Sequence, residues 1–129
     1  MASFSFELVS PERVLFAGDV NSVVVPAAEG TITVLAGHAP FMSALRAGIV
    51  TVDAGKRLFV RGGFVDVSAK GLTLLAEAAI ALEDANPDAV RADIAAAETA
   101  LKDAKSDFER ASAADTLEGL KVLSAAISH

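Results

Sequence analysis

Apolar and polar residues alternate along the first two thirds of the chain. Phe4, Phe6 and Leu8 are separated by Ser5 and Glu7, which is the two-residue period of a strand with one buried face. Similar short segments follow as far as about residue 83, with glycine or proline between them. Two hairpins are expected, joining residues 48–52 with 57–61 and residues 64–67 with 72–75. The pattern predicts an antiparallel β-sandwich.

The apolar residues take up a helical period after residue 85. Asn86 supplies an N-cap, Pro87 suits the first helical position and Asp88 favours the first turn. Apolar residues then recur at steps of three and four, at Val90, Ile94, Ala97, Leu101, Ala104 and Phe108. This narrow seam suits one partner helix. We therefore expect a sandwich domain of residues 1–84 and a helical hairpin of residues 85–129.

The sequence pattern leaves the break between the two helices open. Residues 106–109 form a capping box, and so do residues 115–118. The apolar seam continues through Phe108 and Ala111 and fails only at Asp115, which slightly favours the later break. Both breaks remain alternatives at this point.

Composition limits the classes of partner. The chain has 129 residues, a formal charge of −6 and 53% hydrophobic residues. An acidic chain is a poor ligand for nucleic acid and for anionic lipid, since both favour clustered Lys and Arg. The sequence has no cysteine, no leader-like start and no uninterrupted run of 18 apolar residues. We expect no disulfide, and membrane association through protein partners only.

The stretch 29–41 is the best candidate for a recognition surface, because two rigid turns flank a short alternating strand. Gly30 permits a positive φ, and Pro40 fixes the backbone just after the turn that contains His38. No Asp, Glu or Cys lies at metal-ligand spacing around His38. We interpret His38 as a turn residue with a polar contact, and we expect no metal and no cofactor.

The remaining motifs indicate no catalytic chemistry. Gly62-Gly63 lacks the helix start and the Lys-Ser/Thr pair of a phosphate loop, so a bulge or a tight strand turn is expected there. No Gly-x-Ser-x-Gly nucleophile elbow occurs. Acids near the helix start, such as Asp84 and Asp93, are interpreted as caps and as partners of the helix dipole. We therefore expect a protein that is not an enzyme.

Several motifs in the N-terminal region occur in an order that resembles one family. They are Phe6 to Arg13, Phe16-Ala17-Gly18, Val23 to Pro26, Glu29-Gly30, Gly37-His38-Ala39-Pro40, Gly62 to Val67 and Leu72 to Ala76. Together they resemble the ε subunit of the bacterial-type F-type ATP synthase, the counterpart of the mitochondrial δ subunit. Because the motifs are ordered and need no gap, their combination is far more specific than any one of them.

The resemblance implies a rotor part that clasps the γ subunit, rests on the membrane-embedded c-ring and couples proton-driven rotation to the catalytic head. It also implies a peripheral place on the cytoplasmic side of a bacterial plasma membrane, and a second helix that starts at Asp107-Phe108. The residues that match the c-ring-facing loops are Glu29, Gly30, Thr31, Gly37, His38, Ala39, Pro40 and Phe41.

The resemblance extends to a degenerate nucleotide motif, for which Glu83, Asp88, Arg91 and Ala92 are the matching residues. Pro87 occupies the aliphatic position of that motif. Phosphate recognition needs converging cations, and beyond Arg91 the helices offer mainly isolated ones, so ATP binding is not expected.

In the family the two C-terminal helices lie folded on the sandwich or extend into the head, where they contact the catalytic α and β subunits and inhibit ATP hydrolysis. The segment 116–129 has no basic cluster, so weak inhibition is expected. The alternative function is a free-standing nucleotide or small-ligand sensor with a sandwich and a helical lid. Exposed apolar surface on the sandwich would favour the rotor, because a surface that normally meets γ is sticky when bare.

Overall fold

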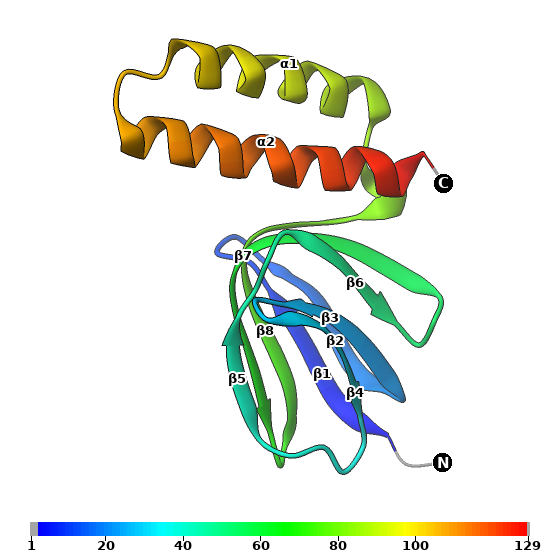
Figure 1. The fold of residues 1–129 in the computed structure, drawn as a ribbon. Coiled ribbons are helices and arrows are strands. Elements are labelled where there is room, and N and C mark those ends of the chain that lie inside the picture. The colour runs from blue at the N-terminus through cyan, green and yellow to red at the C-terminus, as the bar shows by residue number, and fades with distance from the viewer. Residues whose placement is uncertain (1–2, 129) are drawn as a thin grey trace. The chain divides into compact units, whose positions relative to one another are not determined.

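The computed structural model describes residues 3–128 and forms two compact units, which divide between Ala81 and Leu82 (Figure 1). This division lies slightly before the boundary that we expected after residue 84. The first unit contains the strands β1 (Phe4–Val9), β2 (Val14–Val20), β3 (Ser22–Ala27), β4 (Gly30–Leu35), β5 (Phe41–Ala44), β6 (Gly48–Val52), β7 (Lys56–Ser68) and β8 (Gly71–Ala81). The second unit contains the short 3-10 helix η1 (Leu82–Asp84), α1 (Pro87–Asp103) and α2 (Asp107–Ile127).

The strands are hydrogen-bonded in the order β2-β1-β8-β7-β6-β3-β4, and β5 pairs with β7. Both predicted hairpins are confirmed: β6 pairs with β7 up to Val52 and Lys56, and β7 pairs with β8 up to Ser68 and Gly71. One pairing differs from the antiparallel expectation, because β1 lies parallel to β8. Since β1 and β8 are far apart in sequence, no local turn signal could reveal the direction of this pairing. The sandwich followed by two packed helices is confirmed.

Strand β7 serves both layers of the sandwich (Figure 1). Its first half pairs with β6, and its second half pairs with β5. The change occurs at Gly62 and Gly63, whose φ angles are +70° and +105°. A Cβ on Gly63 would lie 1.8 Å from the carbonyl oxygen of Leu75. The register with β8 is the same on both sides of the glycines. The expected bulge or tight turn is therefore wrong: the strand continues, and glycine permits a bend without an inserted residue.

The core of the sandwich follows the alternation of the sequence. In β1 the side chains of Phe4, Phe6 and Leu8 are buried, while Ser5 and Glu7 are exposed. The rings of Phe6 and Phe16 lie 5.3 Å apart between centroids. Burial of each such side chain contributes about 1.5–3 kcal/mol. The other fully buried large side chains are Leu58, Leu72, Leu74, Val20, Val23, Val25, Val50, Val60 and Val65.

Helix α1 starts as the sequence predicts. The side chain of Asn86 accepts hydrogen bonds from the backbone N–H groups of Asp88 and Ala89, at 2.8 and 3.2 Å. Pro87 is the first helical residue. The two amides that Asn86 satisfies would otherwise have no partner within the helix, so the cap stabilises this end.

The earlier of the two alternative breaks separates the helices. Ala104 has an extended backbone with ψ of 134°, and the Ser106 side chain accepts a hydrogen bond from the Glu109 N–H at 3.0 Å. The carboxylate of Glu109 in turn accepts from the Lys105 N–H at 3.3 Å. The seam argument for a break at Asp115 is therefore wrong, because Asp115 lies inside α2. Phe108, which the seam argument counted as buried, is 82% exposed.

Candidate functional site

The two turns of the stretch 29–41 lie at opposite ends of β4. The first turn joins β3 to β4, with Ala27 opposite Gly30, and Gly30 has a φ of +143°. The second turn follows Leu35, and Gly37 has a φ of +82°. A six-residue strand separates its ends by about 17 Å. The structure therefore does not bring the two turns together at one end of the sandwich.

Strand β4 is an edge strand, because within the described residues it pairs with β3 alone. Ile32 and Val34 face inward, and Thr31, Thr33 and Leu35 are exposed. Glu29, Ala39, Pro40 and Phe41 are also exposed. Both turns belong to the β4 edge, which we define as residues 29–41 on one side of the sandwich. A partner with a large surface can contact both turns along this edge.

His38 lies in the second turn and is half-buried. Its Nδ1 lies 2.6 Å from the carbonyl oxygen of Leu35, and its Nε2 lies 2.8 Å from the carbonyl oxygen of Ser68. The ring meets that of Phe4 edge to face, at 5.4 Å between centroids. The interpretation of His38 as a turn residue with polar contacts is confirmed. Within residues 3–128, no group of three His, Asp or Glu side chains is placed to hold a metal ion.

An apolar row crosses the outer face of the layer in which β5, β7, β8, β1 and β2 are paired. The sequence pattern did not predict it. Ala44 lies opposite Phe64, Phe64 opposite Leu75, Leu75 opposite Val9, and Val9 opposite Val14. Phe64, Leu75 and Val14 are 59%, 54% and 55% exposed. These five residues are called the apolar row below. Large side chains exposed together in this way are typical of a protein interaction surface.

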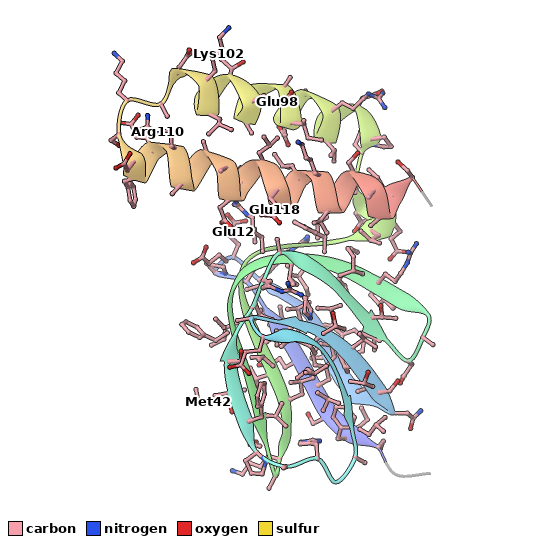
Figure 2. The ribbon with its side chains drawn as sticks, viewed as in Figure 1. Glu12, Met42, Glu98, Lys102, Arg110 and Glu118 are labelled. Atoms are coloured by element: carbon pink, nitrogen blue, oxygen red, sulfur yellow. The ribbon has the colours of Figure 1, made fainter. Side chains whose placement is uncertain are left out.

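A mostly polar row runs beside the apolar row on the same outer face. Asp66, Thr73 and Glu7 lie opposite one another on β7, β8 and β1, and Met42 on β5 is opposite Asp66. Met42 is 72% exposed and projects away from its strand (Figure 2). An apolar centre beside charged residues is the usual composition of a protein–protein interface. The sequence signal for the row was weak: adjacent apolar residues such as Leu74-Leu75 place one side chain on each face.

The nucleotide motif lies at the start of the helical unit. Glu83 is in η1, and Asp88, Arg91 and Ala92 are in the first turns of α1. The guanidinium of Arg91 forms an ion pair with the carboxylate of Asp88, and both side chains are largely exposed. Lys102 also lies on α1, about 17 Å from Arg91 along the helix axis. Arg91 therefore has an anionic partner within its own helix.

A second pair of charges lies near the connection between the helices. The guanidinium of Arg110 donates to the carboxylate of Asp107 at 2.6 Å. Lys102 and Arg110 both lie toward this end of the hairpin (Figure 2), whereas Arg91 lies near the opposite end of α1. The cations therefore do not converge as a phosphate site requires. That the motif does not hold ATP stays a prediction.

No helix within the described residues has both the length and the apolar character needed to cross a membrane.

Residues 3–82 match the sequence profile of the family described as ATP synthase, Delta/Epsilon chain, beta-sandwich domain. The match includes all eight strands, so the class is that of the ATP synthase delta and epsilon subunits. The ATP synthase epsilon chain of Parvibaculum lavamentivorans is 48% identical over 92% of this chain and 93% of its own length. The chain therefore belongs to the family of ATP synthase epsilon chains, which are non-catalytic subunits.

Solved structures show the same fold. A chain in the mitochondrial ATP synthase of Euglena gracilis has a TM-score of 0.81 and 22% identity, over 98% of this chain and 82% of its own. A chain in the central stalk and c-ring of the Tetrahymena thermophila mitochondrial ATP synthase has a TM-score of 0.72 and 12% identity, over 98% and 97%. At these identities the likeness concerns the fold.

Proposed function

We propose that this chain is a rotor part of the central stalk in a proton-translocating ATP synthase, and that it transmits c-ring rotation through γ to the catalytic head. Membership of the epsilon-chain family supports this role, and the chain with the same fold in Tetrahymena thermophila belongs to a central stalk and c-ring assembly. Rotation requires rigid contacts and no bond chemistry. A sandwich with short turns resists shear in this way.

The apolar row is the proposed contact with the γ subunit, and it is the observation that carries the proposal. Phe64 and Leu75 are more than half exposed although they occupy the middle of paired strands. Exposed aromatic and aliphatic side chains lose water when a partner covers them, and such burial stabilises a complex by about 25 cal/mol per Å² before the costs of association. A free-standing small-ligand sensor has no partner subunit, so it would not require an exposed apolar row.

The β4 edge is the proposed contact with the c-ring. It includes the residues that the family resemblance assigns, from Glu29, Gly30 and Thr31 at one turn to Gly37, His38, Ala39, Pro40 and Phe41 at the other. Because the turns lie about 17 Å apart along the strand, the contact would extend along the edge. Through these partners the chain would be peripheral to a bacterial plasma membrane, on the cytoplasmic side.

The helical hairpin is the proposed regulatory arm, with weak inhibition of ATP hydrolysis. Residues 82–129 contain ten acidic and five basic residues. The extended arm of inhibitory relatives meets an acidic segment of a catalytic subunit with basic side chains. An acidic arm would be repelled there, since like charges placed close together are destabilising. Contacts with the catalytic α and β subunits would therefore be weak or transient.

Cross-linking in assembled complexes tests these contacts. The chain has no cysteine, so single cysteines at Glu29, Ala39 and Phe64 each report one surface. We expect Glu29→Cys and Ala39→Cys to cross-link to the c-ring, and Phe64→Cys to cross-link to γ. Lys121→Cys, on the helical unit, is the matched control. Assembly without a cross-link from Phe64→Cys to γ would overturn the γ surface, and failure of the tagged chain to recover γ and the c-ring from membranes would overturn the rotor role.

Truncation tests the arm. A chain that ends after residue 85 retains every strand. We expect complexes with this chain to hydrolyse ATP less than about twofold faster than the intact complex, since weak inhibition of this size is under 0.5 kcal/mol. A tenfold rise would show that the arm inhibits strongly in spite of its charge.

A further inference from the structure

Met42 is the side chain on which the oxidation chemistry of the chain is concentrated. The sequence contains two methionines, Met1 and Met42, and no Cys, Trp or Tyr. Thiols and thioethers are the groups in proteins that peroxides oxidise most easily. Among the residues that the structure describes, Met42 is therefore the expected target of a peroxide.

The structure leaves the thioether of Met42 open to such a reagent. Met42 lies on β5, which pairs with β7 at the margin of its layer. Its side chain is 72% exposed and projects away from the strand (Figure 2). A peroxide can therefore reach the sulfur from solvent without any opening of the fold.

Met42 also lies next to the apolar row. It is two residues from Ala44 on β5, so both side chains point to the same face of the sheet. Phe64 lies opposite Ala44, which makes Phe64 the diagonal neighbour of Met42. Diagonal neighbours are about 7–8 Å apart, within reach of aromatic and long side chains. Met42 thus extends the apolar surface beyond the β5 end of the row.

We propose that Met42 is an oxidation site of the free chain, and that its sulfoxide weakens binding to γ. The oxidation concerns the chain alone, whereas the loss of affinity rests on the proposed γ contact. The sulfur gives an electron pair to one oxygen of hydrogen peroxide, the S–O bond forms and the O–O bond breaks. The other oxygen leaves as water with the remaining hydrogen atoms, so sulfur is oxidised and peroxide is reduced by two electrons.

The new oxygen changes what this corner of the surface offers to a partner. A thioether is apolar and flexible, whereas a sulfoxide is polar and accepts hydrogen bonds. Asp66 lies opposite Met42 on β7 and is exposed. A carboxylate also only accepts, so it cannot satisfy the sulfoxide oxygen. Water satisfies that oxygen in the free chain, and a covering γ surface removes this water at a cost in affinity.

The order of assembly and oxidation then matters. In the free chain the sulfur is exposed, and in the complex a γ subunit seated on the apolar row would shield it. Oxidation before assembly therefore selects against the damaged chain, while assembly before oxidation protects Met42. Methionine sulfoxide reductases would return the free chain to its binding form, because they reduce both epimers of the sulfoxide.

Peroxide treatment of the intact free chain tests the modification. After the peroxide is removed, mass spectrometry of the chain and of its peptides should find one added oxygen on Met42, assigned separately from Met1. Titration calorimetry with untreated, isolated γ should then give an affinity about tenfold lower than before treatment. Treatment with methionine sulfoxide reductases A and B together should restore it.

Two variants isolate the sulfur from other effects of peroxide. Met42→Leu has an apolar side chain without sulfur, so its affinity for γ should be the same before and after peroxide treatment. Met42→Gln has a polar side chain of similar length and should bind about tenfold more weakly than Met42→Leu without any peroxide. Because the side chain is exposed, both variants should fold, and unchanged thermal melting verifies this.

A Phe64→Ser chain in the same titrations separates this inference from the proposed γ contact. If Phe64→Ser weakens binding and the Met42 sulfoxide does not, the inference about Met42 is wrong and the γ surface stands. If neither change weakens binding, both are wrong. Failure of peroxide to add oxygen to Met42 in the folded free chain would also overturn the inference.

Discussion

The Oδ1 atom of Asp53 lies 2.7 Å from the backbone N of Asn21, so the β6–β7 turn is fastened to the junction between β2 and β3. The same oxygen accepts from the Ser22 N–H at 3.0 Å. Asp53 has a φ of 52°, in the left-handed region that costs most residues energy. We expect Asp53→Ala to lower the free energy of unfolding by about 1–2 kcal/mol, because both amides lose a charged acceptor. Urea denaturation measures this.

Asp53→Asn is the matched variant. Its amide oxygen still accepts, and Asn tolerates a positive φ as well as Asp does, so the loss should be clearly smaller than for Asp53→Ala. Equal losses in the two variants would show that the negative charge of Asp53, and not its oxygen as an acceptor, stabilises the junction.

Gly63 should tolerate no side chain. An added Cβ would lie 1.8 Å from the Leu75 carbonyl oxygen, at a φ of +105°. We expect Gly63→Ala to cost about 3–5 kcal/mol, because the backbone of β7 or β8 has to move. Thermal melting measures the loss. Gly18→Ala is the control, since its Cβ would meet only the Phe16 ring at 3.9 Å. A Gly63→Ala chain with the wild-type melting temperature would contradict the bend.

Ser106 should control the start of α2. Its side chain accepts from the Glu109 N–H, so Ser106→Ala should destabilise the helical unit by about 1 kcal/mol. Ser106→Asp keeps an acceptor at the N-cap and should retain the stability. Hydrogen exchange of the α2 amides measures both variants. If Ser106→Ala leaves that exchange unchanged while Asp115→Ala raises it, the later break between the helices would be favoured after all.

The apolar row should matter for γ binding and little for folding. Phe64→Ser and Leu75→Ser remove large side chains that are more than half exposed, so the free energy of unfolding should change by less than about 1 kcal/mol. Binding to isolated γ should weaken about tenfold or more for Phe64→Ser, as for a central aromatic contact. Titration calorimetry measures the affinity. Asp66→Asn, on the mostly polar row beside it, should change the affinity less.

Replacement by alanine should affect stability much less at Phe108 than at Leu123. Phe108 is 82% exposed at the start of α2, whereas Leu123 is 6% exposed near its end. We expect Phe108→Ala to change stability by less than about 0.5 kcal/mol and Leu123→Ala to cost about 2–4 kcal/mol. Chemical denaturation followed by helical circular dichroism compares them. A large loss for Phe108→Ala would restore the seam that the sequence pattern indicated.

Local sequence patterns predicted much of the secondary structure of this protein. Alternation in residues 4–8 indicated the inward face of β1, and the glycine-containing turns near residues 55 and 71 indicated both hairpins. Asn86 and Pro87 marked the start of α1. These features depend on neighbours within a few residues, so the chain itself contains the information. The family resemblance correctly placed the start of α2, where the seam pattern failed.

The separation of the two turns around β4 was also implied by the sequence. A strand between two turns holds them apart by its own length, so residues 29–31 and 37–41 had to lie at opposite ends of β4. Only the topology shows that β4 is an edge strand, and this makes the two turns parts of one side of the sandwich.

The tertiary structure alone decided which distant residues meet. The apolar row depends on the parallel pairing of β1 with β8, and the His38 contacts depend on the approach of the Ser68 turn to the β4–β5 turn. Neither follows from periodicity, because the direction and register of strands far apart in sequence are set by packing of the whole core. The sequence by itself determined the strands, the hairpins and the family. Tertiary packing determined which residues form the apolar row and that β4 lies at an edge, because both depend on pairings between strands that are far apart in sequence.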